Sequence, residues 1–298
     1  MQTIESLKRK IKSATDLQSV VRTMKALAAV SIRQYQRAVE SLAVYNRTVE
    51  SGLQIALKNR EKNAFLFSGK VPQIRHLGAI IFGSDQGLCG QLNAQIVSFA
   101  VEKMDELGID RKDRTVMAVG MRLTDYIEDT GQPIIESLTT PGSTAGITPM
   151  VQEIMMILEQ WRFNLQIDHV YLFYSEYLTG ASYRPFMLPL LPVDQTWLAN
   201  LERQKWESRT LPIFTMDWDA LFSALIREYL FVSLYRAFAE SLASENASRL
   251  AAMQNAEKNI EERLTELQGQ FHRQRQMTIT EELLDILAGF EALAASGD

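Results

Sequence analysis

The chain has 298 residues, and its 46% hydrophobic content is enough to bury the core of one or two domains. With 31 basic and 36 acidic residues its net charge is -5, which argues against a dedicated nucleic-acid binder. The single cysteine excludes an intramolecular disulfide and a multi-cysteine metal site, and no uninterrupted apolar run reaches the roughly 18 residues that suggest a membrane span.

The first sixty residues hold 11 basic and 4 acidic side chains. A solvated helix face is favoured over a nucleic-acid contact as the interpretation of this charge, and an acidic partner is a further alternative. The basic residues near the start are followed by a mixed amphipathic run, which lacks the apolar core of a signal peptide. We therefore expect a cytoplasmic protein that reaches a membrane only through partners.

Proline placement predicts the organisation of the chain. All eight prolines lie between Pro72 and Pro212, so both flanks are free of the residue that breaks helices most strongly. In the N-terminal flank, apolar residues recur in steps of three and four, as in a coiled coil. This seam consists of Ile4, Leu7, Ile11, Ala14, Leu17, Val21, Met24 and Ala28, then Tyr35, Ala38, Leu42, Tyr45, Val49, Leu53 and Ala56.

The middle of the chain has the pattern of an α/β layer. Short apolar runs rich in branched and aromatic residues predict strands, and helical patterns lie between them. Such alternation favours a largely parallel sheet. The predicted strands are 76–82, 115–120 and 169–174, the predicted helices are 92–107 and 150–163, and 141–146 is predicted to be a loop.

The C-terminal flank predicts a second long helix from about Trp218. Near its end, the polar run 272–276 is followed by apolar residues from Leu283 to Ala294. Taken alone, the polar run is best explained as a solvated helix surface. An apolar tip beyond it has no partner within such a helix, which suggests burial in another protein.

One loop occupies the place where an α/β protein can bind phosphate. Residues 83–90 follow a predicted strand and precede a predicted helix, but they lack the Lys-Ser/Thr ending of a P-loop and the GxGxxG spacing. A structural turn is therefore favoured over a nucleotide site. None of the three histidines lies in a catalytic or metal-ligand motif, so Cys89 is interpreted as a buried small hydrophobe. No catalytic residue, cofactor or metal is predicted.

Three separated motifs carry a resemblance to a known family. They are Ile11-Lys12-Ser13 with Met24 and Ala28-Ala29; Ser84, Asp85, Gly87, Leu88, Cys89 and Gly90 with Leu92-Asn93; and Ser241–Glu245, Arg249, Ala252-Met253, Arg275-Gln276, Ile279-Thr280 and Glu282-Leu283. Together they span nearly the whole chain, which resembles the gamma subunits of F-type ATP synthases.

The resemblance implies an antiparallel coiled coil of residues 1–71 and 213–298, with a Rossmann-like α/β domain at 72–212 between them. It also implies a non-catalytic rotor shaft, present once per complex inside a hexamer of alpha and beta subunits. In this family, the foot of the coil docks on a ring of membrane-embedded c subunits, and the α/β domain receives the epsilon subunit. The implied location is the cytoplasmic face of a bacterial inner membrane.

Contact residues follow from the matched motifs. The resemblance implies that Arg275, Gln276, Thr280 and Glu282 bind a loop of one beta subunit. Two further beta contacts are implied at Arg249 and at Met24. The c-ring contact falls near Phe214 and Thr215, where the match to the family is poor.

Four positions depart from the family pattern. Gln86 and Gln91 replace an Arg and a Gly, Ser31 replaces a Lys, and His272 replaces an Asn. These departures favour a divergent bacterial member, with a second, alternative ATPase complex as one hypothesis. Proton and sodium coupling stay open as alternatives, as do synthesis and hydrolysis. A generic coiled-coil scaffold explains only the flanks, and a nucleotide-binding enzyme explains only the middle.

Overall fold

The computed structural model describes residues 3–59, 74–206, 210 and 212–295. By their contacts, residues 28–250 form one compact unit, and residues 1–27 with 251–298 form another. Two long helices contribute to both units: α1 (Ile4–Lys58) and α6 (Trp218–Ala295). Within the described residues, no helix combines the length and apolarity needed to cross a membrane.

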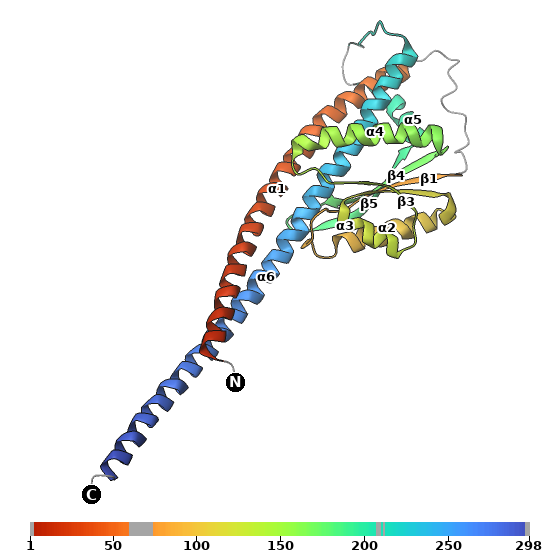
Figure 1. The fold of residues 1–298 in the computed structure, drawn as a ribbon. Helices are drawn as coiled ribbons and strands as arrows, with labels where there is room; N and C mark the ends of the chain where they lie inside the picture. The colour runs from red at the N-terminus through yellow and green to blue at the C-terminus, as the bar shows by residue number, and fades with distance from the viewer. Residues whose placement is uncertain (1–2, 60–73, 207–209, 211, 296–298) are drawn as a thin grey trace. The chain divides into compact units, whose positions relative to one another are not determined.

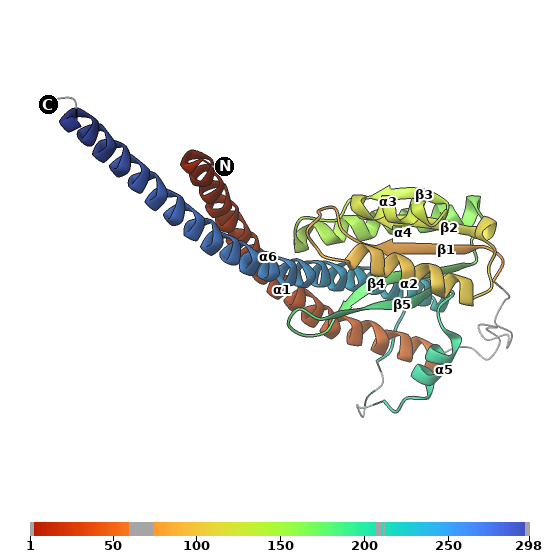
Figure 2. The ribbon, with the colours of Figure 1, turned by 90° about the horizontal axis from the view of Figure 1, so that it is seen from below.

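The larger unit is built on one five-stranded sheet in the order β3-β2-β1-β4-β5 (Figures 1 and 2). Strands β1 to β4 are parallel, and β5 runs antiparallel at one edge. Parallel strands need crossovers, which here are mostly helical. The strands are β1 (Leu77–Phe82), β2 (Arg114–Val119), β3 (Ile134–Leu138), β4 (His169–Tyr177) and β5 (Tyr183–Leu191).

Helices cover both faces of this sheet. Figure 1 shows α4 (Ile147–Asn164) on one side, and α2 (Leu92–Glu106) and α3 (Met121–Asp129) on the other. The α4 face also receives α6, whose Phe238 ring meets Phe82 edge to face at 4.9 Å. Because both faces are buried, β1 is apolar along its whole length, in agreement with the pattern of buried parallel strands.

In the larger unit α1 runs antiparallel to α6. The Tyr45 hydroxyl donates to Glu228 at 2.7 Å, and Gly52 packs so closely on Leu225 that an added Cβ would lie 2.8 Å from a methyl carbon. A separate apolar cluster joins both helices to α5 (Gln195–Arg203). Its buried members are Val49, Leu53, Leu57, Leu198, Leu201 and Val232.

The smaller unit is an antiparallel helix pair, in which Arg22 of α1 meets Glu257 of α6. The apolar seam of this pair has fewer buried residues than predicted: Leu7 and Val21 are buried, but Leu17 is 52% exposed. Tyr45, which was also predicted in the seam, is 45% exposed in the larger unit, where its hydroxyl reaches Glu228 at the helix surface.

The structure confirms the predicted class of an α/β sheet inserted between two long helices. The predicted strands and helices correspond to β1, β2, β4, α2 and α4, and the predicted loop 141–146 contains one 3-10 turn at Thr144–Gly146. The sequence did not predict β3, β5, α3 or α5 as separate elements. The boundary predicted between residues 71 and 72 lies outside the described residues, and the one between 212 and 213 lies before α6.

Candidate functional site

The turn at residues 83–90 joins β1 to the segment that leads into α2, and its Asp85 ties three elements together. One carboxylate oxygen accepts from the backbone N–H of Met121 at the start of α3, at 2.8 Å. The other accepts from the N–H and hydroxyl of Thr140, at 2.8 and 3.0 Å. The Asp85 carboxylate therefore occupies the N-terminus of α3 and fastens the turn to Thr140, so it is fully used within the chain. The geometry favours the structural interpretation of the turn over a nucleotide site.

Inside the turn, Ser84 and Cys89 are buried. The backbone N–H of Ser84 donates to the Asn93 side-chain oxygen at 3.1 Å, and the Asn93 amide donates back to the Ser84 hydroxyl at 2.9 Å. The Cys89 sulfur lies 3.4 Å from that hydroxyl and is 4% exposed, which confirms its interpretation as a buried small residue. Leu88, by contrast, is 61% exposed at a positive φ of 64°.

The turn is fastened to α6 by a group that we call the turn latch, which consists of Glu245, Ser248 and Arg249. The Ser248 hydroxyl donates to the Cys89 carbonyl, and Arg249 donates to the Gln86 carbonyl at 3.4 Å. Gly90, at φ 59°, lets the backbone approach, since an added Cβ would lie 3.1 Å from the Ser248 oxygen.

The charged part of the turn latch is an ion pair between Glu245 and Arg249, 2.5 Å apart and with both side chains less than a tenth exposed. Burial raises the pKa of Glu245, and the Arg249 charge and hydrogen bond oppose that rise. Arg249, implied as a contact to another subunit, is thus directed into its own chain. Sequence reasoning did not single out Ser248, although Ser241, Ser244 and Ser248 recur at helical spacing among alanines.

The remaining predicted contact residues of α6 lie on its exposed surface in the smaller unit. Arg275, Gln276, Thr280 and Glu282 are all exposed, and the only partner shown for these four side chains is the Gln276 carbonyl, which accepts from Thr280. Exposed large apolar residues lie among and beyond them. These are Met277, Ile279, Leu283, Leu284, Ile286 and Leu287, each between 47% and 70% exposed.

Three other predicted contact residues are half-buried or lie in the segment before α6. Met24 is half-buried in α1, in the same unit as the exposed end of α6. Phe214 is half-buried and Thr215 exposed in the segment that leads into α6, and the neighbouring Ile213 is 93% exposed. The structure gives this segment an accessible apolar surface, which the poor motif match did not indicate.

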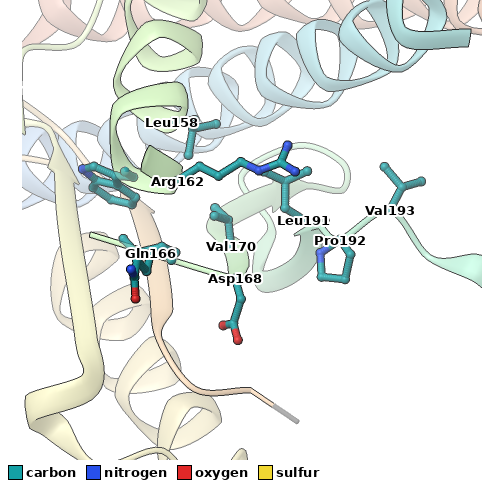
Figure 3. Close-up of a pocket in the computed structure, with 10 residues that line it drawn as sticks. Leu158, Arg162, Gln166, Asp168, Val170, Leu191, Pro192 and Val193 are labelled. Carbon is teal, nitrogen blue, oxygen red and sulfur yellow. The ribbon is translucent and has the colours of Figure 1, made fainter. Parts of the chain in front are cut away.

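A pocket of roughly 490 Å³ lies in the larger unit, between the end of α4 and the strands β4 and β5 (Figure 3). The Asp168 carboxylate in its lining accepts from the backbone N–H groups of Arg75 and His76. Figure 3 shows this carboxylate pointing away from Arg162, so the two charges do not converge on one ligand position. Among the described residues, no group of His, Cys, Asp and Glu side chains is placed to hold a metal.

Comparison with known proteins gives one consistent result. Residues 3–293 match the family model described as ATP synthase. An ATP synthase gamma chain from a Cyanothece species is 29% identical, covering 98% of this chain and 100% of that protein, and one from Cupriavidus pinatubonensis is 26% identical, covering 97% and 99%. A chain of the Euglena gracilis mitochondrial ATP synthase, in a structure of its OSCP, F1 and c-ring, superposes with a TM-score of 0.64 at 19% identity. That match covers 98% of this chain and 95% of the other.

Proposed function

The chain belongs to the ATP synthase family, and on that premise we propose that it is the gamma subunit, the central rotor shaft of an F-type complex. Its function is mechanical, and the catalytic residues belong to the beta subunits. Ion-driven rotation of the c ring turns the shaft, which then presents a different side to each of three beta subunits. A side that binds one conformation better shifts that subunit toward it.

The observation that carries this proposal is the exposed surface of α6 between residues 275 and 287. It combines charged and amide side chains with six large apolar residues that have little cover in their own chain. Apolar surface of this kind marks an interface. A beta-subunit loop would meet a cation at Arg275, an anion at Glu282, and neutral hydrogen-bonding groups at Gln276 and Thr280. Met24 adds an apolar contact.

Arg249 has a different role in this proposal. Its guanidinium is buried against Glu245 and the turn carbonyl of Gln86, so it supports the turn from inside the chain. Its effect on the beta subunits therefore passes through the exposed part of that turn, at Gln86 and Leu88.

The epsilon subunit and the c ring bind the larger unit. The α/β sheet domain receives the epsilon subunit, and the c ring contacts the segment before α6 at Phe214 and Thr215. The exposed Ile213 and Met216 beside them supply apolar surface for that contact. The subunit is held through the c ring at the cytoplasmic face of a bacterial inner membrane, with one copy in each complex.

Co-expression with alpha and beta subunits tests the proposal. After purification through a tag on beta, one copy of this chain is expected for every three beta subunits, with ATP hydrolysis that depends on it. Failure to co-purify, under conditions where alpha and beta assemble, would favour a scaffold with other partners. Specific nucleotide binding by the isolated chain would favour the enzyme alternative.

The exposed α6 surface is tested separately by the double variant Arg275→Ala/Gln276→Ala. It should lower the hydrolysis rate of the assembled complex while leaving the isolated chain folded, because both side chains are solvent-exposed. The matched control is Arg263→Ala, which removes an exposed cation paired within α6 to Glu266. Equal rates in the double variant and the control would contradict the assigned contact.

A further inference from the structure

A second pocket, of about 480 Å³, lies within the larger unit between α1, α6 and the edge strand β5. This volume falls in the range of roughly 300–1,000 Å³ that small-molecule sites occupy. Apolar and aromatic side chains supply most of the wall, among them Leu42, Phe186, Leu188, Trp197 and Tyr229. The pocket therefore has the size and the lining of a site for a small apolar molecule.

Aromatic rings enter this wall from two sides, and each ring is packed against another. Trp197 of α5 stacks on Tyr229 of α6, with ring centroids 4.7 Å apart. On the sheet, Tyr174 of β4 meets Phe186 of β5 at 5.4 Å. Such rings give an aromatic ligand offset or edge-to-face contacts in addition to the burial of its surface. The lining thus favours an aromatic body for the ligand.

The Tyr174 hydroxyl gives the pocket a polar group without a partner. Tyr174 is 2% exposed, and its hydroxyl forms no hydrogen bond with any described residue. The oxygen is nevertheless not among the side-chain atoms cut off from both solvent and a partner, and the pocket is the space that Tyr174 lines. Burial raises the pKa of this phenol, so at neutral pH it keeps its proton and can donate it.

The charges around the pocket balance one another. Arg236 donates to Glu240 at 2.6 Å and lies 3.9 Å from Glu176, which also accepts from Arg184 at 2.6 Å. The remaining charges of the lining, one of each sign, are Arg47 and Glu50. A charged ligand would lose hydration here without a net countercharge to replace it, so the site favours a neutral molecule.

We propose that this pocket binds a small neutral aromatic molecule that carries a hydrogen-bond acceptor, such as a ketone. The ring displaces water from the apolar wall, and the acceptor receives the hydrogen bond of the Tyr174 hydroxyl. A hydrocarbon of the same shape would leave that hydroxyl buried without a partner, which weakens binding. The lining comes from α1, α5, α6 and the sheet, so the ligand binds the folded unit alone and stabilises it.

Equilibrium dialysis of the full-length chain tests the proposal with 2-acetylnaphthalene, a neutral aromatic ketone. The matched probes are 2-ethylnaphthalene, which has the same shape without the carbonyl, and 2-naphthoate, which is charged. The parent chain should bind the ketone saturably, and more tightly than either matched probe. Thermal unfolding should shift to higher temperature as the ketone is added.

Two variants place the ketone in this pocket. Tyr174→Phe removes no hydrogen bond of the chain, and it should weaken ketone binding about two- to tenfold, the range for one hydrogen bond, without weakening 2-ethylnaphthalene. Its control is Tyr171→Phe on the same strand, in the core of the other sheet face, which should change neither affinity. Ala43→Phe fills the pocket from an exposed position on α1 and should abolish binding of both molecules.

Absence of saturable binding by the parent chain would overturn the proposal. So would equal affinities for the ketone and the hydrocarbon, tighter binding of 2-naphthoate, or full ketone affinity in Ala43→Phe. Equal weakening of both neutral probes by Tyr174→Phe would show a packing effect and contradict the hydrogen bond. The measurement needs no other subunit, so its result is independent of whether the chain co-purifies with beta.

Discussion

Replacing Arg249 with Met should destabilise the chain strongly at neutral pH. The variant keeps the side chain's bulk but leaves the Glu245 carboxylate, 7% exposed, without its partner. Removing one member of a buried pair costs about 3–5 kcal/mol, because the remaining charge is neither solvated nor paired. For a unit of roughly 150–250 residues, this corresponds to a fall in Tm of about 6–20 °C.

The size of this effect should depend on pH in a defined direction. Burial and the nearby Asp85 raise the pKa of Glu245, and without Arg249 the two opposing influences are gone, so the pKa rises further. A raised folded-state pKa means that stability is intact below the unfolded value of about 4.3 and is lost as pH rises through the folded value. The variant should therefore approach the parent in stability as pH is lowered from 8 to 5.

Thermal unfolding at pH 8, 6.5 and 5, followed by circular dichroism, measures both effects. The matched control is Arg227→Met, on the same helix and in the same unit, whose pair with Glu159 is 2.8 Å long but more than half exposed. Exposed pairs contribute about 0–1 kcal/mol, so this control should stay near the parent. Equal losses in the two variants, or a loss in Arg249→Met that does not change with pH, would refute the reasoning.

Three further predictions concern the turn and the coil. Gly120→Ala should lower the free energy of unfolding by about 1–3 kcal/mol, because φ is 119° and the new Cβ would lie 2.7 Å from the backbone nitrogen of Ser84 in the turn. The control is Gly87→Ala, whose added Cβ would have no heavy atom within 4 Å. Ser248→Ala should speed labelling of Cys89 by a thiol reagent, because the turn loses a bond to α6, and an unchanged rate would contradict the latch. Because its bonds to Lys25 and Arg22 lower the pKa of Glu257, the stability that this carboxylate contributes should be lost as pH falls through that pKa, and Glu257→Gln should reduce this pH dependence in thermal unfolding.

The sequence predicted those elements whose signal is local. Strand β1 is buried along its whole length and reads as an unbroken apolar run, whereas β3 alternates between half-buried and exposed residues over only five positions. The antiparallel β5 contains Pro185 and Pro189, which sequence reasoning takes as a sign against a strand. Its position at the edge of the sheet, known only from the fold, allows both prolines.

The candidate site was predictable to a similar extent. The turn 83–90 could be located from its residues, and the burial of Cys89 followed from the missing catalytic partners. The fastening of the turn to α6 could not, because Cys89 and Ser248 are 159 positions apart in the sequence. The same holds for the pairing of Arg22 with Glu257, because these residues lie on two helices that are far apart in the sequence and their alignment is known only from the structure.

The physical basis of packing differs between the two parts of α6, and so should the effects of mutation. Beside the larger Phe238 and Leu242, its buried face between residues 237 and 248 includes several small side chains, Ala237, Ala243, Ser244 and Ala247. Enlarging them creates steric clashes in the core, so these substitutions should act through the fold of the isolated chain. From residue 275 onward the described side chains are mostly exposed, so substitutions there should leave that fold intact and act only once a partner covers the surface.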